Sequence, residues 1–332
     1  MSVPLIERFR DRLPVSDATP VVSLGEGSTP LLRAPRLSEE LGLDLWLKLE
    51  SANPTGSFKD RGMAVAVPKA VEDGAAAVVC ASTGNTAASA AAYAARAGVR
   101  AVVLVPAGAV AVGKLAQARA LGARVVEVRG SFDQTLRAAL RLGDDGGYAL
   151  VNSLNPYRLE GQKTAAFELL DELGAPPDVL ALPYGGGGNT RAYHLGFLEA
   201  GAGLPRILAV AAADRRGTVG SAIRIAQPAH AEHVEAAVRA SGGAVRAVSD
   251  SELLDAWRAL GREGVFCEPA SAAGIAGLAG AGLDRGTRVV CVITGHGLKD
   301  PDTAARETDS PVQVDADFDA IAAASDPFPP GE

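Results

Sequence analysis

The sequence has little of several features that mark specialised chains. Its 332 residues include four histidines, two tryptophans and three cysteines, and aromatic side chains make up only 5% of it. The cysteines, Cys80, Cys267 and Cys291, are odd in number and far apart, which argues against a disulfide framework and fits reduced thiols in a cytoplasmic protein. No run of Lys or Arg offsets the formal net charge of −7, so neither nucleic acid nor an anionic membrane is an expected partner.

Long hydrophobic runs are absent as well. Arg, Asp or Gly interrupts each apolar stretch, and none is long enough to span a bilayer. Residues 1–14 mix charged and apolar side chains and lack the continuous apolar core of a signal peptide. We therefore expect a soluble, cytoplasmic protein that acts on small molecules.

The sequence does contain enough apolar material for a large core, because 48% of its residues are hydrophobic. From about residue 43, short Val- and Leu-rich runs alternate with Ala-rich amphipathic stretches, a pattern typical of an α/β fold with mostly parallel sheets. The predicted strands are 45–49, 77–81, 101–105, 124–128, 179–182, 207–210 and 289–293. The predicted helices are 58–71, 86–97, 113–121, 132–141, 159–173, 190–200, 252–262 and 272–281.

Two loops in the first half of the chain carry polar groups at strand ends, where α/β sheets bind ligands. NPTGSFKDRG (53–62) places Lys59 in the first turn of a helix, although a surface lysine paired with Asp60 or Glu50 is the simpler alternative. STGNTAAS (82–89) offers hydroxyls and free N–H groups at a helix start, which suit a carboxylate or phosphate. An ordinary helix cap is the alternative for this second loop.

Two further loops lie in the second half. PYGGGGNT (183–190) allows the main chain to approach an anion closely, and the alternative is a flexible turn. It lacks both the P-loop Lys-Ser/Thr and the G-x-G-x-x-G spacing, which argues against a kinase or a dehydrogenase. In TGHGLKD (294–300), the Thr294 hydroxyl could bond a ring nitrogen, with His296 and Lys299 facing the same site. His230 and His233 could suggest a metal pair, but no third ligand lies nearby, so we predict no metal site.

Together the four loops offer a lysine for an aldehyde, a polar contact, an anion cradle and a hydroxyl for a ring nitrogen. Pyridoxal phosphate has one group for each of them: an aldehyde, a ring substituent, a phosphate and a ring nitrogen. The sequence also resembles the threonine synthase family, within the larger group of pyridoxal-phosphate enzymes that share the tryptophan synthase β fold. The resemblance runs from about residue 25 to 301 through GEGSTPL, NPTGSFKDRGM, STGNTAAS, GKLAQA, VNSLNPYRLEGQKTAAFE, EPASAAG and TGHGLKD.

The resemblance implies a fold type II architecture of two three-layer αβα domains with mostly parallel sheets. The smaller domain would span residues 50–142, and the larger would combine 1–49 with 143–325. The acidic tail, residues 310–332, is expected to fray. A homodimer is also implied.

The resemblance further implies roles for individual residues. Lys59 would be the catalytic residue and the Schiff-base lysine, Asn85 would contact the cofactor's ring hydroxyl, and Thr294 would meet its pyridine nitrogen. The residues implied to hold the cofactor phosphate are Gly185, Gly186, Gly187, Gly188 and Asn189. Those implied to bind the substrate are Ser82, Thr83, Thr86, Ser153 and Arg158. For Arg158, an ion pair with Glu160 or Asp171 is the structural alternative.

The implied activity is that of a carbon–oxygen lyase, which converts O-phospho-L-homoserine and water to L-threonine and phosphate by γ-elimination and β-replacement. Two positions depart from the family pattern: Ala109 replaces the usual lysine and Gly186 the usual asparagine, and both bear on the substrate. The alternatives are a threonine or serine dehydratase, or a diverged enzyme performing another β or γ replacement on a specialised amino acid. A non-catalytic metabolite-binding relative is the third, against which Lys59, Asn85 and Thr294 argue.

Overall fold

The computed structural model describes residues 3–108, 112–144 and 147–325, with only the backbone at 112–114. The chain divides into two units, residues 1–300 and 301–332, which are considered separately. Two sheets form the first unit, and their strands follow two orders, β5-β4-β3-β6 and β1-β2-β10-β7-β8-β9. Every pairing is parallel except that of β1 with β2. The predicted α/β fold with mostly parallel sheets is therefore confirmed.

For all seven predicted strands, the observed bounds lie within two residues of the predicted ones. The four-stranded sheet consists of β3 (Ala77–Ala81), β4 (Arg100–Pro106), β5 (Arg124–Val128) and β6 (Tyr148–Leu150). The six-stranded sheet consists of β1 (Leu31–Arg33), β2 (Asp44–Lys48), β7 (Val179–Pro183), β8 (Arg206–Ala212), β9 (Ala244–Val248) and β10 (Arg288–Val292). The prediction missed β1, β6 and β9, which lie at sheet edges and lack the fully apolar pattern of buried strands.

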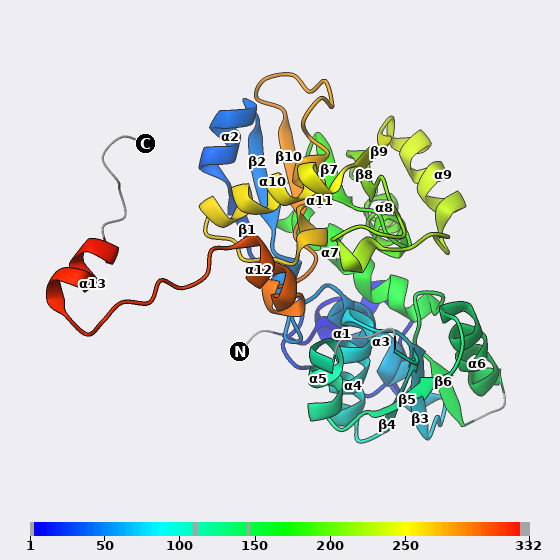
Figure 1. Cartoon of the computed structure of the whole chain (residues 1–332). Coiled ribbons are helices and arrows are strands. Elements are labelled where there is room, and N and C mark those ends of the chain that lie inside the picture. The colour runs from blue at the N-terminus through cyan, green and yellow to red at the C-terminus, as the bar shows by residue number, and fades with distance from the viewer. Residues whose placement is uncertain (1–2, 109–111, 145–146, 326–332) are drawn as a thin grey trace. The chain divides into compact units, whose positions relative to one another are not determined.

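Helices cover both faces of each sheet (Figure 1). Side chains of α3 (Lys59–Glu72), α4 (Asn85–Ala97) and α5 (Val112–Ala120) share one core with β3 and β4, whereas α6 (Phe132–Asp144) packs on the opposite face. On the larger sheet, one core contains α7 (Pro156–Leu173), α8 (Gly188–Ala200) and α9 (Ala231–Ser241). Its other face meets α11 (Ala273–Ala276), on which α10 (Asp250–Arg262) packs. These are the two expected αβα sandwiches.

The predicted helix at 272–281 is wrong in length. A 3₁₀ turn (Pro269–Ala272) leads into α11, which ends at Ala276. Gly280 and Gly282 have φ angles of 69° and 62°, which a right-handed helix does not contain. Other helices were missed because they are short or lie outside the expected βα pattern: α1 (Leu5–Arg8), α2 (Pro35–Leu41), α9, α12 (Pro301–Glu307) and α13 (Phe318–Ser325).

The boundary at residue 142 and the frayed tail stay predictions. β6 lies beyond that boundary and pairs with β3 of the four-stranded sheet. α13 lies within the predicted tail, and none of its residues is buried. No helix among the described residues is both long and apolar enough to cross a membrane.

α3 and α7 approach each other until their backbones touch. A Cβ atom added to Gly161 of α7 would lie 2.0 Å from the carbonyl oxygen of Arg61 in α3. One added to Gly62 would lie 2.9 Å from the carbonyl oxygen of Arg158. The Arg61 side chain reinforces this contact, because it bonds Glu50 at 2.7 and 2.8 Å and Glu168 at 2.6 and 2.8 Å. Small residues and one paired arginine therefore fix the start of α3 against α7.

Gly161→Ala should lower the free energy of unfolding by about 1–3 kcal/mol, since the added methyl group must force α3 and α7 apart. Gly261→Ala is the matched control, because Gly261 lies in α10 with nothing within 4 Å of an added Cβ. Helix propensity alone should make that control more stable, by at most about 1 kcal/mol. Urea denaturation midpoints measure both changes. Equal midpoints for the two variants would show that the helix contact is not tight.

Candidate active site

Main-chain pairing brings the Lys59 loop to Thr294. Hydrogen bonds of 3.1 and 2.9 Å join residues 56–58 to residues 294–296, which follow β10. Lys59 begins α3 directly after this pairing. The Thr294 hydroxyl is buried and lies 2.9 Å from the Ser271 hydroxyl. Two residues that are 235 positions apart are thus held on adjacent segments.

Glu268 joins the same group. Its backbone N–H donates to the Gly295 carbonyl at 3.0 Å, and its Oε1 accepts from Asn85 Nδ2 at 2.9 Å. A Cβ atom on Gly295 would lie 2.2 Å from that Oε1, so only glycine lets the carboxyl reach Asn85. Burial raises the pKa of Glu268 to about 7. This carboxyl ties the first residue of α4 to the segment that carries Thr294.

The environment of Lys59 favours a neutral amine. Burial removes water from the ammonium and the positive charge of Arg158 repels it, and together these lower its pKa to about 7, although Glu268 partly opposes the shift. Nζ lies 4.1 Å from the centroid of the Phe58 ring. In the described part of the chain Lys59 pairs with neither Asp60 nor Glu50, so the surface-lysine alternative is wrong. An amine with this pKa can exchange a proton near neutral pH.

Asn152 brings the loop after β3 to the turn after β6. Its side-chain amide donates to the Ala81 carbonyl and accepts from the Ala81 N–H, both at 2.9 Å. The residues predicted to bind the substrate follow Ala81 on one segment and Asn152 on the other. Ser82, Thr83 and Thr86 come after Ala81, whereas Ser153 and Arg158 come after Asn152, and all but Arg158 are partly exposed.

Arg158 is fully buried and incompletely bonded. Nη1 donates to the Val151 carbonyl at 3.3 Å, but Nε and Nη2 have no hydrogen-bond partner among the described residues. Glu160 pairs with Lys163 and Asp171 with Arg8, so the alternative of an ion pair to Arg158 is wrong. Burial lowers the pKa of Arg158 to about 10. Buried N–H groups on a cation are costly without an acceptor, which indicates a place for an anion.

The glycine loop, residues 185–189, connects β7 to α8. Gly187 has a φ of 86°, and a Cβ there would lie 2.7 Å from Val234 Cγ2. The first helical hydrogen bond runs from Arg191 N to the Gly187 carbonyl, which leaves the preceding N–H groups of α8 without helical acceptors. Asn189 Nδ2 and the Thr190 hydroxyl are also buried, and no described residue bonds them. A helix start with these free donors suits an anion.

Gly186 and Ala109 are the two positions that depart from the family pattern. A Cβ atom on Gly186 would make only an ordinary contact of 3.6 Å with Ile225, so space does not demand glycine there. Ala109 lies outside the described residues.

His296 and Lys299, also expected near the site, both lie beside Gly56 of the Lys59 loop, and each has a partner there. The His296 ring packs edge-on against Phe266, with centroids 5.6 Å apart. Lys299 Nζ donates to Gln117 Oε1 of α5 at 2.5 Å, and so connects the segment after β10 to the smaller sheet's helices. His230 and His233 have ring centroids 5.9 Å apart, and no group of three metal-binding side chains occurs among the described residues.

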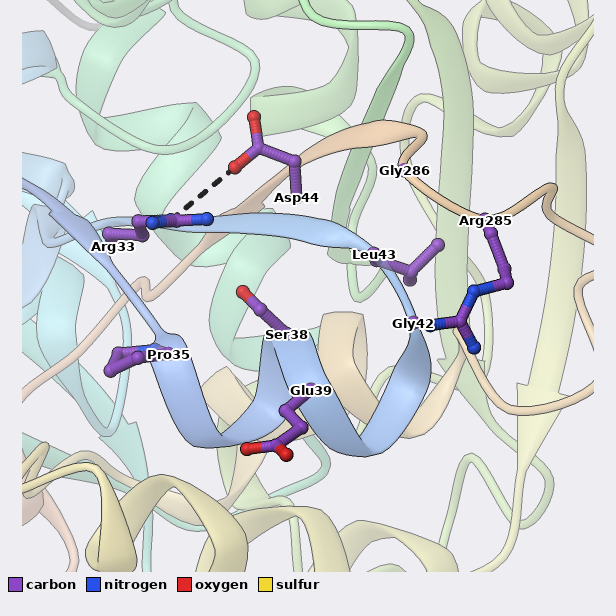
Figure 2. A pocket seen from close by; sticks show the side chains of 9 residues that line it. All are labelled: Arg33, Pro35, Ser38, Glu39, Gly42, Leu43, Asp44, Arg285 and Gly286. Carbon is purple, nitrogen blue, oxygen red and sulfur yellow. Dashed lines mark ion pairs between the residues drawn. The ribbon is translucent and has the colours of Figure 1, made fainter.

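A groove of about 680 Å³ lies elsewhere on the molecule, at the amino ends of β2 and β10 (Figure 2). Two of its charged groups, Arg33 and Asp44, bond each other. Arg33 pairs with Asp44 at 3.5 Å, and the Arg285 guanidinium packs over Gly42. Since strand carboxyl ends carry the residues described above, this groove is not the candidate site.

Sequence reasoning assigned no role to three residues that build the site: Glu268, Asn152 and Gln117. EPASAAG, VNSLNPYR and GKLAQA contain these three residues, so the motifs carried a signal. Their partners, however, lie 183, 71 and 182 positions away in the chain. Only the folded backbone reveals such pairings.

Comparison with known proteins agrees with this geometry. Residues 22–295 match the family model described as pyridoxal-phosphate dependent enzyme. The chain belongs to this pyridoxal-phosphate-dependent enzyme family. It is 50% identical to threonine synthase of Synechocystis sp. over 93% of this chain and 87% of that protein. It is 49% identical to threonine synthase of Halalkalibacterium halodurans over 92% of each, and 44% identical to that of Methanocaldococcus jannaschii over 95% and 85%.

Solved structures share the fold of this chain. Maize serine racemase superposes with a TM-score of 0.76 at 21% identity, covering 91% of this chain and 96% of that one. Tomato threonine deaminase isoform 2 gives 0.74 at 22% identity, covering 91% and 86%. Both the predicted fold type and the resemblance to threonine synthase are confirmed.

In the apoprotein, Lys59 should react with acetic anhydride as an amine of pKa near 7, so its rate should rise with pH and level off above about pH 7. Arg158→Gln should raise this pKa, because a repelling positive charge is removed. Arg206→Gln, at the exposed start of β8, is the control and should change nothing. Peptide mass spectrometry from pH 5 to 11 gives the rates. Half-titration of wild-type Lys59 near its ordinary value of 10.5 would contradict the described environment.

Proposed function

We propose that this protein is a threonine synthase, which converts O-phospho-L-homoserine and water to L-threonine and phosphate. The observation that carries the proposal is Arg158, a buried cation with two N–H groups that no described residue accepts. A guanidinium with free donors binds phosphate well, because two parallel hydrogen bonds and the charge act together. Relatives that are about 50% identical over most of the chain bear the name threonine synthase, which supports the same conclusion.

The proposal assigns pyridoxal phosphate to four segments. Lys59 would carry its aldehyde carbon, Asn85 would face the ring hydroxyl, and Thr294 the ring nitrogen. The glycine loop (Gly185, Gly186, Gly187, Gly188 and Asn189) would hold its phosphate. The buried amide of Asn189, which no described residue bonds, fits an anion at this loop. When bound, the cofactor supplies a sink for the electrons left on the substrate's Cα after deprotonation.

Lys59 is the proposed base. With a pKa near 7, a substantial fraction of its amine is neutral at physiological pH and can take the Cα proton. Arg158 would bind the substrate phosphate and stabilise it as it leaves Cγ, which lowers the barrier to elimination. That departure would also require a proton to leave Cβ, the carbon to which water then adds. Ser153 and Thr86 would supply hydroxyl donors to that phosphate, and Ser82 and Thr83 would complete the substrate site. These roles are assigned from position and chemistry.

Three broader features belong to the same proposal. We assign the protein to the cytoplasm and expect it to act as a homodimer. We also expect a smaller domain of residues 50–142 and a larger one that combines residues 1–49 with 143–325. The buried, unbridged state of Cys80, Cys267 and Cys291 supports a reducing compartment. Analytical ultracentrifugation would decide the oligomeric state.

The assay that tests the proposal offers the purified holoenzyme O-phospho-L-homoserine, L-threonine and L-serine in turn. We expect phosphate and L-threonine in equal amounts from the first, and no oxo acid from the others. Lys59→Ala should abolish turnover together with the borohydride-sensitive visible absorbance, because both need the amine. Lys69→Ala is the control, since that lysine pairs with Glu72 at the far end of α3. Release of oxo acid from threonine or serine would identify a dehydratase instead.

A further inference from the structure

His230 lies where two segments of the site meet. It is 3% exposed and precedes α9. Its backbone N–H donates to the Gly186 carbonyl of the glycine loop at 3.0 Å. Its ring Nε2 lies 2.9 Å from the Ser153 carbonyl, and Nδ1 lies 3.3 Å from Arg191 Nη1. One residue therefore bonds the glycine loop, the turn at Ser153 and the first turn of α8.

The partners of the ring fix its protonation. A carbonyl oxygen only accepts, so Nε2 must carry the hydrogen that bonds Ser153. A guanidinium only donates, so Nδ1 must be bare and accept from Arg191. His230 is thus a neutral imidazole in one tautomer. Burial lowers its pKa, and the charge of Arg191 and the neighbouring His233 and Lys59 lower it further, which together outweigh the raising effect of the Ser153 bond.

The glycines next to His230 permit this arrangement. A Cβ atom on Gly187 would lie 3.2 Å from His230 Cβ, and one on Gly188 would lie 3.5 Å from ring Cδ2. The ring therefore rests on the glycine loop while it points to Ser153. Both ring nitrogens therefore face protein groups.

We infer that His230 is a positioning residue that fixes the Ser153 turn against the glycine loop and so sets the affinity of the substrate-phosphate site. The inference rests on the proposed function for the identity of the two anions. The Nε2 bond holds the Ser153 carbonyl and, with it, the adjoining turn that leads to Arg158. Loss of that bond should loosen the Ser153 turn, whereas the bond between Nδ1 and Arg191 should remain.

Two amide substitutions separate the two ring bonds. In His230→Gln the amide nitrogen can reach the place of Nε2 and donate to Ser153. In His230→Asn the amide reaches only the place of Nδ1, so it can serve Arg191 but not Ser153. His233→Asn is the matched control, because that neighbouring ring is exposed and bonds neither segment. Should the Asn variant fail to fold, His230→Met removes the Nε2 donor with a side chain of similar length.

The measurement is calorimetric titration of each holoenzyme with inorganic phosphate, alongside thermal melting. We expect phosphate to bind about tenfold more weakly to the Asn variant, equivalent to ~1.4 kcal/mol. The Gln variant should stay within about threefold of wild type, as a retained hydrogen bond predicts. The His233 control should match wild type.

Equal affinities in the Gln and Asn variants, whether both normal or both reduced, would overturn the inference. Phosphate binding by the wild type without formation of threonine would overturn the proposed function alone. A wild type that binds no phosphate would overturn both.

Discussion

The contact between α3 and α7 sets the chemistry around Lys59. Gly62 and Gly161 let the two backbones touch, which no larger residue at Gly161 would allow, since its Cβ would meet Arg61 at 2.0 Å. Because of this approach, Arg158 in the first turn of α7 repels the Lys59 ammonium in the first turn of α3. Repulsion and desolvation together keep the amine available as a base. The close packing of α3 against α7 thus determines the reactivity of the Lys59 amine.

Two buried arginines at this contact have opposite roles. Arg61 donates to both oxygens of Glu50 and of Glu168, and these carboxylates raise its pKa. Arg158 has no carboxylate partner among the described residues, and burial lowers its pKa to about 10. Breaking a satisfied buried pair would be destabilising, so Arg61 belongs to the framework. A buried cation with unpaired N–H groups is instead typical of an anion site without its ligand.

How much the sequence reveals depends on how far apart the interacting groups lie in the chain. Strands such as β3 and β7 were located to within a residue, because burial on both faces makes them apolar throughout. Edge strands β1 and β9 were not, since exposure leaves their composition mixed. The loops with Lys59 and Thr294 stood out because each follows a strand end. The hydrogen bond of Glu268 to Asn85 could not be foreseen, because it depends on how two distant segments are brought together.

The most direct test of the central claim is a crystal structure of the holoenzyme with inorganic phosphate or a non-hydrolysable phosphonate analogue of the substrate. The account predicts an anion bonded to Nε and Nη2 of Arg158, with the Lys59 nitrogen bonded to the cofactor nearby. Density showing those two N–H groups bonded to a protein carboxylate, or to solvent alone while the anion binds elsewhere, would contradict it.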